Sequence, residues 1–465
     1  MSLMAPSRPA FGRLSDPQPA PQPLLIGLAA LSFTLLGVGL VNPGSLANFV
    51  YYAVLWHAFV LLLHRDELPR FSFAFAVSAS FIVVYYLVQV RVYPDSYGTT
   101  APLGSWTDDS YFYALVADTI PVGMELRDNY FLYSHPFTSL IRILTPLSID
   151  HPMDVIFFQA GVSATLATFS GRFALQLTRD AALARSVFLF TLVCPFLMMN
   201  GGVILIRDTL SAALFVYSLC CIQSRRFALA VCAVGLQLAI RPGTALILLP
   251  AYAIIYYSEI GHLLRRHAAA ACGMAFLLFG MAFALLTSDL DTPSLFSGTS
   301  EGGAVGLLGR ELIEGLTVDP ESNVVFLSLQ ELPFIVKLPL NAAYIFAYPF
   351  ISLRYAFPGE QFDIRAVVLN IVTPVYAIWL NAWFVAGALT SFERRVGFRA
   401  VVVAVLLAFL LIGTYSLQTR HKTIIYPLFY LVIAFGLHHA TARARAIGYG
   451  CSLALIALQF AFLFR

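Results

Sequence analysis

Charged side chains are scarce in this chain. Only 11% of its 465 residues are charged, against roughly 25% in ordinary soluble domains. So few charges cannot cover a water-facing surface, and hydrophobic residues make up 59% of the chain. The formal net charge of +3 is spread over short links and forms no block, which argues against nucleic-acid binding. We therefore expect the lipid bilayer to be the solvent for most of the chain.

Cysteine is absent from the polar loops. All six cysteines fall within apolar stretches, at Cys194, Cys220, Cys221, Cys232, Cys272 and Cys451. This placement indicates neither a disulfide framework nor a zinc site. The N-terminus lacks a small-residue cleavage site, so residues 1–22, which carry Arg8 and Arg13, are predicted to be a cytoplasmic tail before a retained first helix.

Long apolar runs are what the chain has in abundance. Runs of about 17 to 25 apolar residues can cross a hydrocarbon core of about 30 Å as helices. The expected spans are residues 24–41, 46–63, 71–90, 153–171, 183–203, 209–222, 227–240, 243–257, 268–287, 366–388, 400–416, 423–438 and 446–464. The predicted fold class is an all-α integral membrane protein, with about thirteen transmembrane helices in one domain over residues 23–465.

The placement of arginine predicts which side of the membrane each link faces. With the tail inside, the links near Arg65, Arg172, Arg225 and Arg265 all return inside, which is the positive-inside pattern of a bacterial inner membrane. Counting residues 332–355 as a further span would place the later inner links on the outer side of the membrane. That segment is therefore predicted to lie along the outer interface, because Pro339 suits an interfacial segment better than a spanning helix.

Two large loops then face the periplasm, over residues 91–152 and 288–361, and we expect them to bear short interfacial helices. The first is acidic and rich in tyrosine, and Asp108 and Asp109 mark the start of a helix within it. Acids at a helix start are favoured by capping and by the helix dipole alone. In a loop beside the membrane they also suit a catalytic base that accepts a proton from an acceptor hydroxyl.

His135 lies in the same loop after two tyrosines. It is a candidate for substrate binding or acid–base chemistry, although a lone loop histidine is more often structural. Asp108, Asp109 and Asp128 with His135 have carboxylate and imidazole groups that can hold a divalent metal. Their spacing matches no diagnostic metal motif, so no metal or other cofactor is predicted.

Three further segments place basic residues on the expected outer side of the membrane, where the positive-inside rule disfavours them. Arg207 and Asp208 follow paired glycines that can break a helix. Arg241 lies in a tight turn between two short helices, and Arg420, His421 and Lys422 form a compact basic cluster. Guanidinium and ammonium groups there suit the phosphate of a lipid-linked donor. The alternatives are salt bridges to the acidic loop, snorkelling to the interface, or contact with anionic lipid headgroups.

Taken together, these segments resemble bacterial multi-pass glycosyltransferases of the GT-C superfamily and the neighbouring exopolysaccharide and O-antigen polymerases. The likeness is carried by Asp108-Asp109 with the tyrosines that follow, and by residues 205–210, 240–243 and 419–428. The resemblance implies a polyprenyl-phosphate-linked sugar donor, a glycan or lipid acceptor, and a base at Asp108 or Asp109. In that superfamily the base-bearing loop usually follows the first helix, whereas here it follows the third.

The predicted function is therefore sugar transfer at the periplasmic face in cell-envelope polysaccharide synthesis, by a transferase or a polymerase. A competing class is a transporter or flippase of a lipid-linked or anionic substrate, because such proteins also carry broken helices and charges at membrane boundaries. The chain shows no convincing repeat between its halves, which weighs against that class. A non-catalytic assembly subunit is the third alternative.

Overall fold

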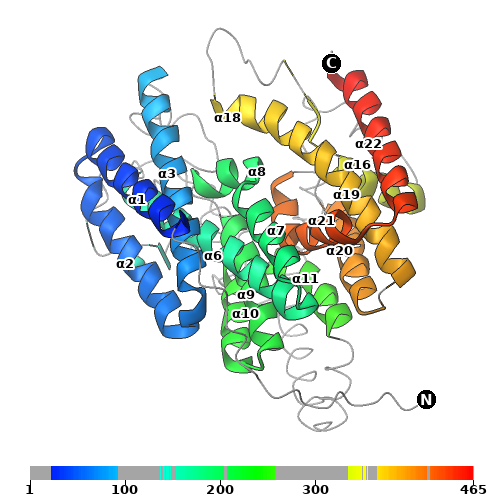
Figure 1. Ribbon diagram of the computed structural model, residues 1–465, viewed down its shortest axis with the longest axis horizontal. Coiled ribbons are helices and arrows are strands. Elements are labelled where there is room, and N and C mark those ends of the chain that lie inside the picture. Colours follow the sequence, from blue (N-terminus) through cyan, green and yellow to red (C-terminus); the bar gives the residue numbers. More distant parts are fainter. Residues whose placement is uncertain are drawn as a thin grey trace, which may run out of the picture.

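The computed structural model describes residues 22–92, 137, 140–141, 143–145, 147, 153–203, 207–256, 334–347, 349–351, 353, 364–394, 396–415 and 419–463. Within these ranges the chain is helical and contains no strand, which confirms the all-α prediction for the part described. In Figure 1 the earliest helices form one side, those of residues 153–256 the centre, and the last helices the opposite side.

The first group of helices is α1 (Gln22–Val41), α2 (Ser45–His64), the 3₁₀ turn η1 (Arg65–Glu67) and α3 (Leu68–Val92). The central group is α6 (Met153–Thr178), α7 (Ala181–Leu192), α8 (Pro195–Leu197), the π-helical turn η2 (Met198–Gly202), α9 (Arg207–Gln223), α10 (Phe227–Ile240) and α11 (Pro242–Ile255). The last group is α16 (Phe334–Ala347), α18 (Ile364–Val367), the π-helical turn η3 (Val368–Val372), α19 (Thr373–Arg394), α20 (Val396–Tyr415), the 3₁₀ helix η4 (Thr419–Ile425), α21 (Tyr426–His439) and α22 (Ala442–Leu463).

Three stretches of the described chain are long and apolar enough to cross a membrane: Ser45–Val88, Met153–Thr178 and Val368–Glu393. The first of them contains two helices, α2 and α3, joined through η1. Shorter apolar helices occur at Ala29–Val41, Ala181–Leu192, Phe227–Ile240 and Phe398–Ile412. These apolar helices indicate association with a membrane, and the number of about thirteen spans stays a prediction.

Helix α6 lies at the centre of the packing, against α3, α7 and α9. Two of its polar side chains bond within the helix itself: the Thr165 hydroxyl donates to the carbonyl of Gly161 and the Ser170 hydroxyl to that of Leu166. These internal bonds let a helix with several serines and threonines lie almost wholly inside the protein.

The last group packs through glycine. Gly387 of α19 faces Gly436 of α21 so closely that a Cβ on Gly436 would lie 2.1 Å from the backbone oxygen of Trp383. Small residues that let two helix backbones approach are a common device of membrane helix pairs. The contact fixes α19 against α21 and leaves another face of α19 for α22.

One detail of the sequence prediction is wrong. The apolar run 183–203 was expected to form one helix, but α7 ends at Leu192 and the chain continues through α8 and η2. Pro195 stands at the first position of α8, where its missing N–H costs nothing, so it starts a new helix. Pro339 lies within α16, which continues through it and packs against α20, and the interfacial position expected for this segment stays a prediction.

Candidate anion-binding site around α9

Helix α9 begins with the charged pair Arg207 and Asp208, and the preceding described element is the π-helical turn η2. Asp208 lies in the first turn and is 2% exposed. A carboxylate is favoured at this position because the helix dipole places partial positive charge at the N-terminus. A buried carboxylate nevertheless needs a cationic partner to remain charged.

That partner is Arg241, whose guanidinium forms an ion pair with the Asp208 carboxylate. Arg241 is the single residue between α10 and α11 and has an extended backbone conformation, with φ −153° and ψ 80°. The antiparallel packing of α10 on α9 holds it there, because the Gln237 side-chain amide donates to the backbone oxygen of Ser211 at 3.2 Å. The predicted tight turn at residues 240–243 is thereby confirmed.

The third basic segment, η4, also packs against α9. Lys422 lies in it and is only 4% exposed. Burial lowers the pKa of Lys422 from 10.5 to about 7, because removing an ammonium group from water disfavours its charged form. Arg420 and His421 belong to the same 3₁₀ helix, and the structure describes their backbone but not their side chains.

The fold therefore joins three segments that are far apart in the sequence, at residues 207–208, 241 and 419–422. A carboxylate and a guanidinium are paired within them, and a lysine that changes charge near neutral pH lies in a helix against the same element. Chemically, such an arrangement suits the binding of a phosphate or another anion, since guanidinium and ammonium groups both donate to phosphate oxygens.

The other predicted site residues, Asp108, Asp109 and His135, lie outside the described residues. The Asp208 carboxylate pairs with Arg241, a partner within the helical bundle. Within the described ranges no group of three or more histidine, cysteine, aspartate and glutamate side chains could hold a metal ion.

Asp154 is a buried carboxylate to which the sequence analysis assigned no role. It lies in the first turn of α6, is 3% exposed, and accepts a hydrogen bond of 2.5 Å from the Ser45 hydroxyl of α2. The Asn42 amide donates in turn to Ser45 at 2.9 Å. Its position at a helix start was visible in the sequence. Its burial was not, because it depends on how α2 lies against α6.

Comparison of the chain with protein-family models, with characterised proteins and with solved structures gives no match.

Proposed function

We propose that the chain is a membrane glycosyltransferase that transfers a sugar or oligosaccharide from a polyprenyl-phosphate-linked donor to a glycan or lipid acceptor. The reaction would occur at the periplasmic face of a bacterial inner membrane, in a multi-pass protein. The observation that supports it best is the meeting of Arg207–Asp208, Arg241 and the basic helix η4 around α9. Guanidinium and ammonium groups gathered in a largely apolar helical protein suit the oxygens of a phosphate, and a lipid-linked donor presents its phosphate at the membrane boundary.

In the proposed reaction the acceptor hydroxyl oxygen attacks the anomeric carbon of the donor sugar. The bond between that carbon and the phosphate oxygen breaks, and the phosphate leaves with the electron pair. Arg207, Arg241 and Lys422 would bind the phosphate and stabilise its growing charge. The hydroxyl proton would pass to a carboxylate of the first loop, Asp108 or Asp109.

Asp208 has a positioning role in this scheme. Its carboxylate contacts the Arg241 guanidinium and would fix the orientation of that planar group. A planar guanidinium held in this way presents a second edge to a phosphate. The pair would therefore orient the leaving group and take no part in proton transfer.

A transporter or flippase of a lipid-linked or anionic substrate is the second candidate. The observation that favours it is η2, a π-helical turn that ends in the paired glycines Gly201 and Gly202 and precedes α9 in the chain. Broken helices next to charged residues are a common feature of substrate sites in transporters. The two candidates differ in whether a covalent bond of the donor is broken.

The test compares cells that carry Arg241→Gln, Asp109→Asn or the control Arg443→Gln. Arg443 is exposed at the start of α22, and its loss is expected to leave function unchanged. Membrane abundance of each variant is measured together with cell-envelope glycans and polyprenyl-linked precursors. We expect loss of glycan and accumulation of precursor, per unit of protein in the membrane, in the first two variants only. The abundance of Arg241→Gln is expected to fall, because that change leaves the buried Asp208 carboxylate without its guanidinium.

A purified-protein assay separates the candidates. Release of polyprenyl phosphate from a labelled donor in detergent, without vesicles, supports the transferase. Movement of intact donor between the leaflets of vesicles, with no release, supports the flippase. If Arg241→Gln and Asp109→Asn leave both activities and the glycans unchanged, the proposal is wrong.

A further inference from the structure

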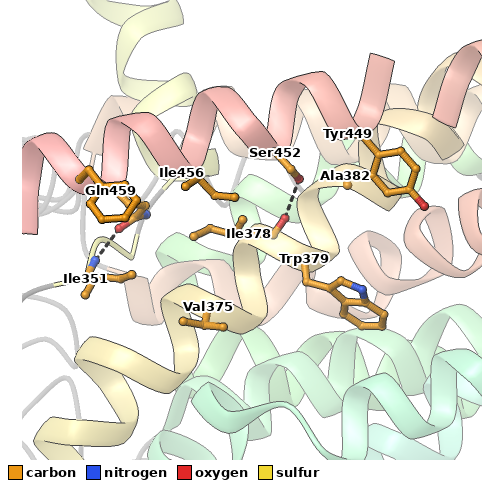
Figure 2. A pocket seen from close by; sticks show the side chains of 10 residues that line it. Ile351, Val375, Ile378, Trp379, Ala382, Tyr449, Ser452, Ile456 and Gln459 are labelled. Carbon is orange, nitrogen blue, oxygen red and sulfur yellow. Dashed lines mark hydrogen bonds between the residues drawn. The ribbon is translucent and has the colours of Figure 1, made fainter. Parts of the chain in front are cut away.

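Helices α19 and α22 run antiparallel and touch closely at one end. A Cβ on Gly448 of α22 would lie 2.3 Å from the backbone oxygen of Ala382 of α19, so the two backbones are in contact there. Farther along the pair, toward Val375 and Gln459, a cavity of about 450 Å³ opens between the helices (Figure 2). This volume falls within the range of small-molecule sites, about 300–1,000 Å³.

Two polar side chains of this groove, Ser452 and Gln459, are bonded within the protein. The Ser452 hydroxyl donates to the carbonyl of Ile378 at 2.9 Å, and the Gln459 amide donates to the carbonyl of Pro349 at 3.1 Å. The Gln459 carbonyl oxygen accepts the backbone N–H of Ile351, and Figure 2 shows the bonds of Ser452 and of Ile351 along the groove. A polar ligand would therefore find few partners here.

The remaining lining is apolar and open to the outside. Val375 and Trp379 of α19 are 54% and 50% exposed, and Phe460 of α22 is 63% exposed. Among the residues that the structure describes, none that lines the groove is charged. The groove opens on the exposed face of a stretch that is long and apolar enough to cross a membrane, Val368–Glu393. In a bilayer such a face meets hydrocarbon.

We propose that this groove, between α19 and α22 near Val375, Trp379, Ile456 and Phe460, binds an acyl chain of a bilayer phospholipid. The chain would fill a gap that the two helices leave where they separate, and contact with apolar walls would hold it more tightly than chains elsewhere around the protein. The phospholipid headgroup would stay at the interface, since the groove contains no cation to bind it. The inference stands independently of the proposed transferase function.

The experiment uses the full chain in phosphatidylcholine vesicles that contain a small share of phosphatidylcholine with a photoreactive diazirine near the end of one acyl chain. After illumination, the labelled residues are mapped by mass spectrometry. We expect labelling of Trp379 and Ile456 to exceed, at least about fivefold, that of exposed side chains outside the groove, such as Leu453 of α22 and Val403 of α20.

A matched pair of variants tests the site itself. Val375→Trp places a large ring at the mouth of the groove, and Leu453→Trp places the same ring on α22 outside it. Both side chains are exposed in the native protein, 54% and 68%, so neither change disturbs the core. Val375→Trp is expected to reduce labelling of Ile456 by at least about fivefold, and Leu453→Trp to leave it unchanged.

Two results would overturn the proposal. Equal labelling of the groove and of Leu453 and Val403 would show that lipid only surrounds the protein there. Displacement of the label by polyprenyl phosphate at a few per cent of total lipid, with no displacement by the same amount of unlabelled phospholipid, would show that the groove holds an isoprenoid chain.

Discussion

The two longest unbroken apolar helical stretches, Met153–Thr178 and Val368–Glu393, have the same length, 26 residues, and opposite environments. The most apolar part of the first, in α6, is 94% buried within the protein, whereas that of the second, in α19, is 33% buried. The buried helix is also the less apolar of the two. Among membrane helices this order is expected, since lipid is as apolar as leucine and the protein interior collects small and polar residues.

The difference shows that a run of hydrophobic residues indicates a spanning helix but does not indicate whether protein or lipid surrounds it. Helix α6 and its partner α9 form a region of internal hydrogen bonds and buried charge, including Asp208 and Arg241. Helix α19 and its partner α22 form a region of glycine contacts with an exposed apolar face.

The largest effect is expected at the backbone contact of α19 with α21. Gly436→Val would place a side chain where the Trp383 carbonyl and the Gly387 backbone already lie. Because backbone cannot move aside as a side chain can, we expect destabilisation of about 3 kcal/mol or more and little folded protein. Gly450→Val is the control, since nothing lies within 4 Å of its added Cβ. The yield of monodisperse protein and the thermal unfolding temperature in detergent are measured for both variants. Equal yields and equal unfolding temperatures would contradict the close packing.

The buried ion pair of α9 is expected to be nearly as sensitive. Arg241→Leu leaves the Asp208 carboxylate, whose side chain is 3% exposed, without its guanidinium, and breaking such a pair typically costs about 3–5 kcal/mol. The double variant Asp208→Leu with Arg241→Leu removes both charges and should recover most of that loss. Thermal unfolding of the two single variants and the double variant measures the coupling. Additive losses would mean that the pair contributes no interaction of its own.

The affinity for an anion is expected to depend on pH through Lys422. Its pKa of about 7 means that its charge falls as the pH rises from 6 to 8.5, so affinity for a short-chain isoprenyl phosphate should fall about tenfold, or roughly 1.4 kcal/mol. Lys422→Met is the control, because it retains any pH effect from ionisation of the phosphate itself. Calorimetric titration at both pH values measures the two profiles, and parallel profiles would exclude Lys422 from the site.

The lowered pKa of Lys422 also makes the stability of the fold depend on pH. Between pH 7 and 10.5 the unfolded chain holds a proton on Lys422 that the folded chain has lost. The free energy of unfolding should therefore rise with pH across this window. In Lys422→Met this contribution to the pH dependence of unfolding should disappear.

The smallest effect is expected at Asp180, which joins the two regions. Its carboxylate accepts the backbone N–H groups of Ala182 and Leu183 as the N-cap of α7, and it lies 3.2 Å from His439 of α21. Asp180→Ala should cost about 1 kcal/mol, and Asp180→Asn less, since asparagine also caps helices.

The Asp180 cap also has a pH dependence. The N–H of Leu183 contributes most to lowering the pKa of the carboxyl below 3.8. Its stabilisation is therefore present above pH 3.8 and lost as the pH falls through the lowered pKa. Unfolding measured from pH 3 to 6 should show this loss in the native chain and not in Asp180→Ala.

The sequence by itself determined that the chain is helical and apolar, and much of where its helices begin and end. The turn at Arg241 was predictable because proline and glycine follow it and cannot extend α10. The break after Leu192 was missed because a continuous apolar run hides it. These features depend on neighbours in the sequence, which is why local patterns report them.

Only the tertiary structure decided which of these segments meet. Residues far apart along the chain meet where Asp208 pairs with Arg241 and where η4 packs on α9. The burial of Lys422 and Asp154 likewise depends on distant segments. Burial depends on which face of a helix its neighbours cover, and no periodicity within one helix specifies the neighbour. The apolar groove between α19 and α22 arises in the same way, from two backbones that touch at Gly448 and separate beyond it.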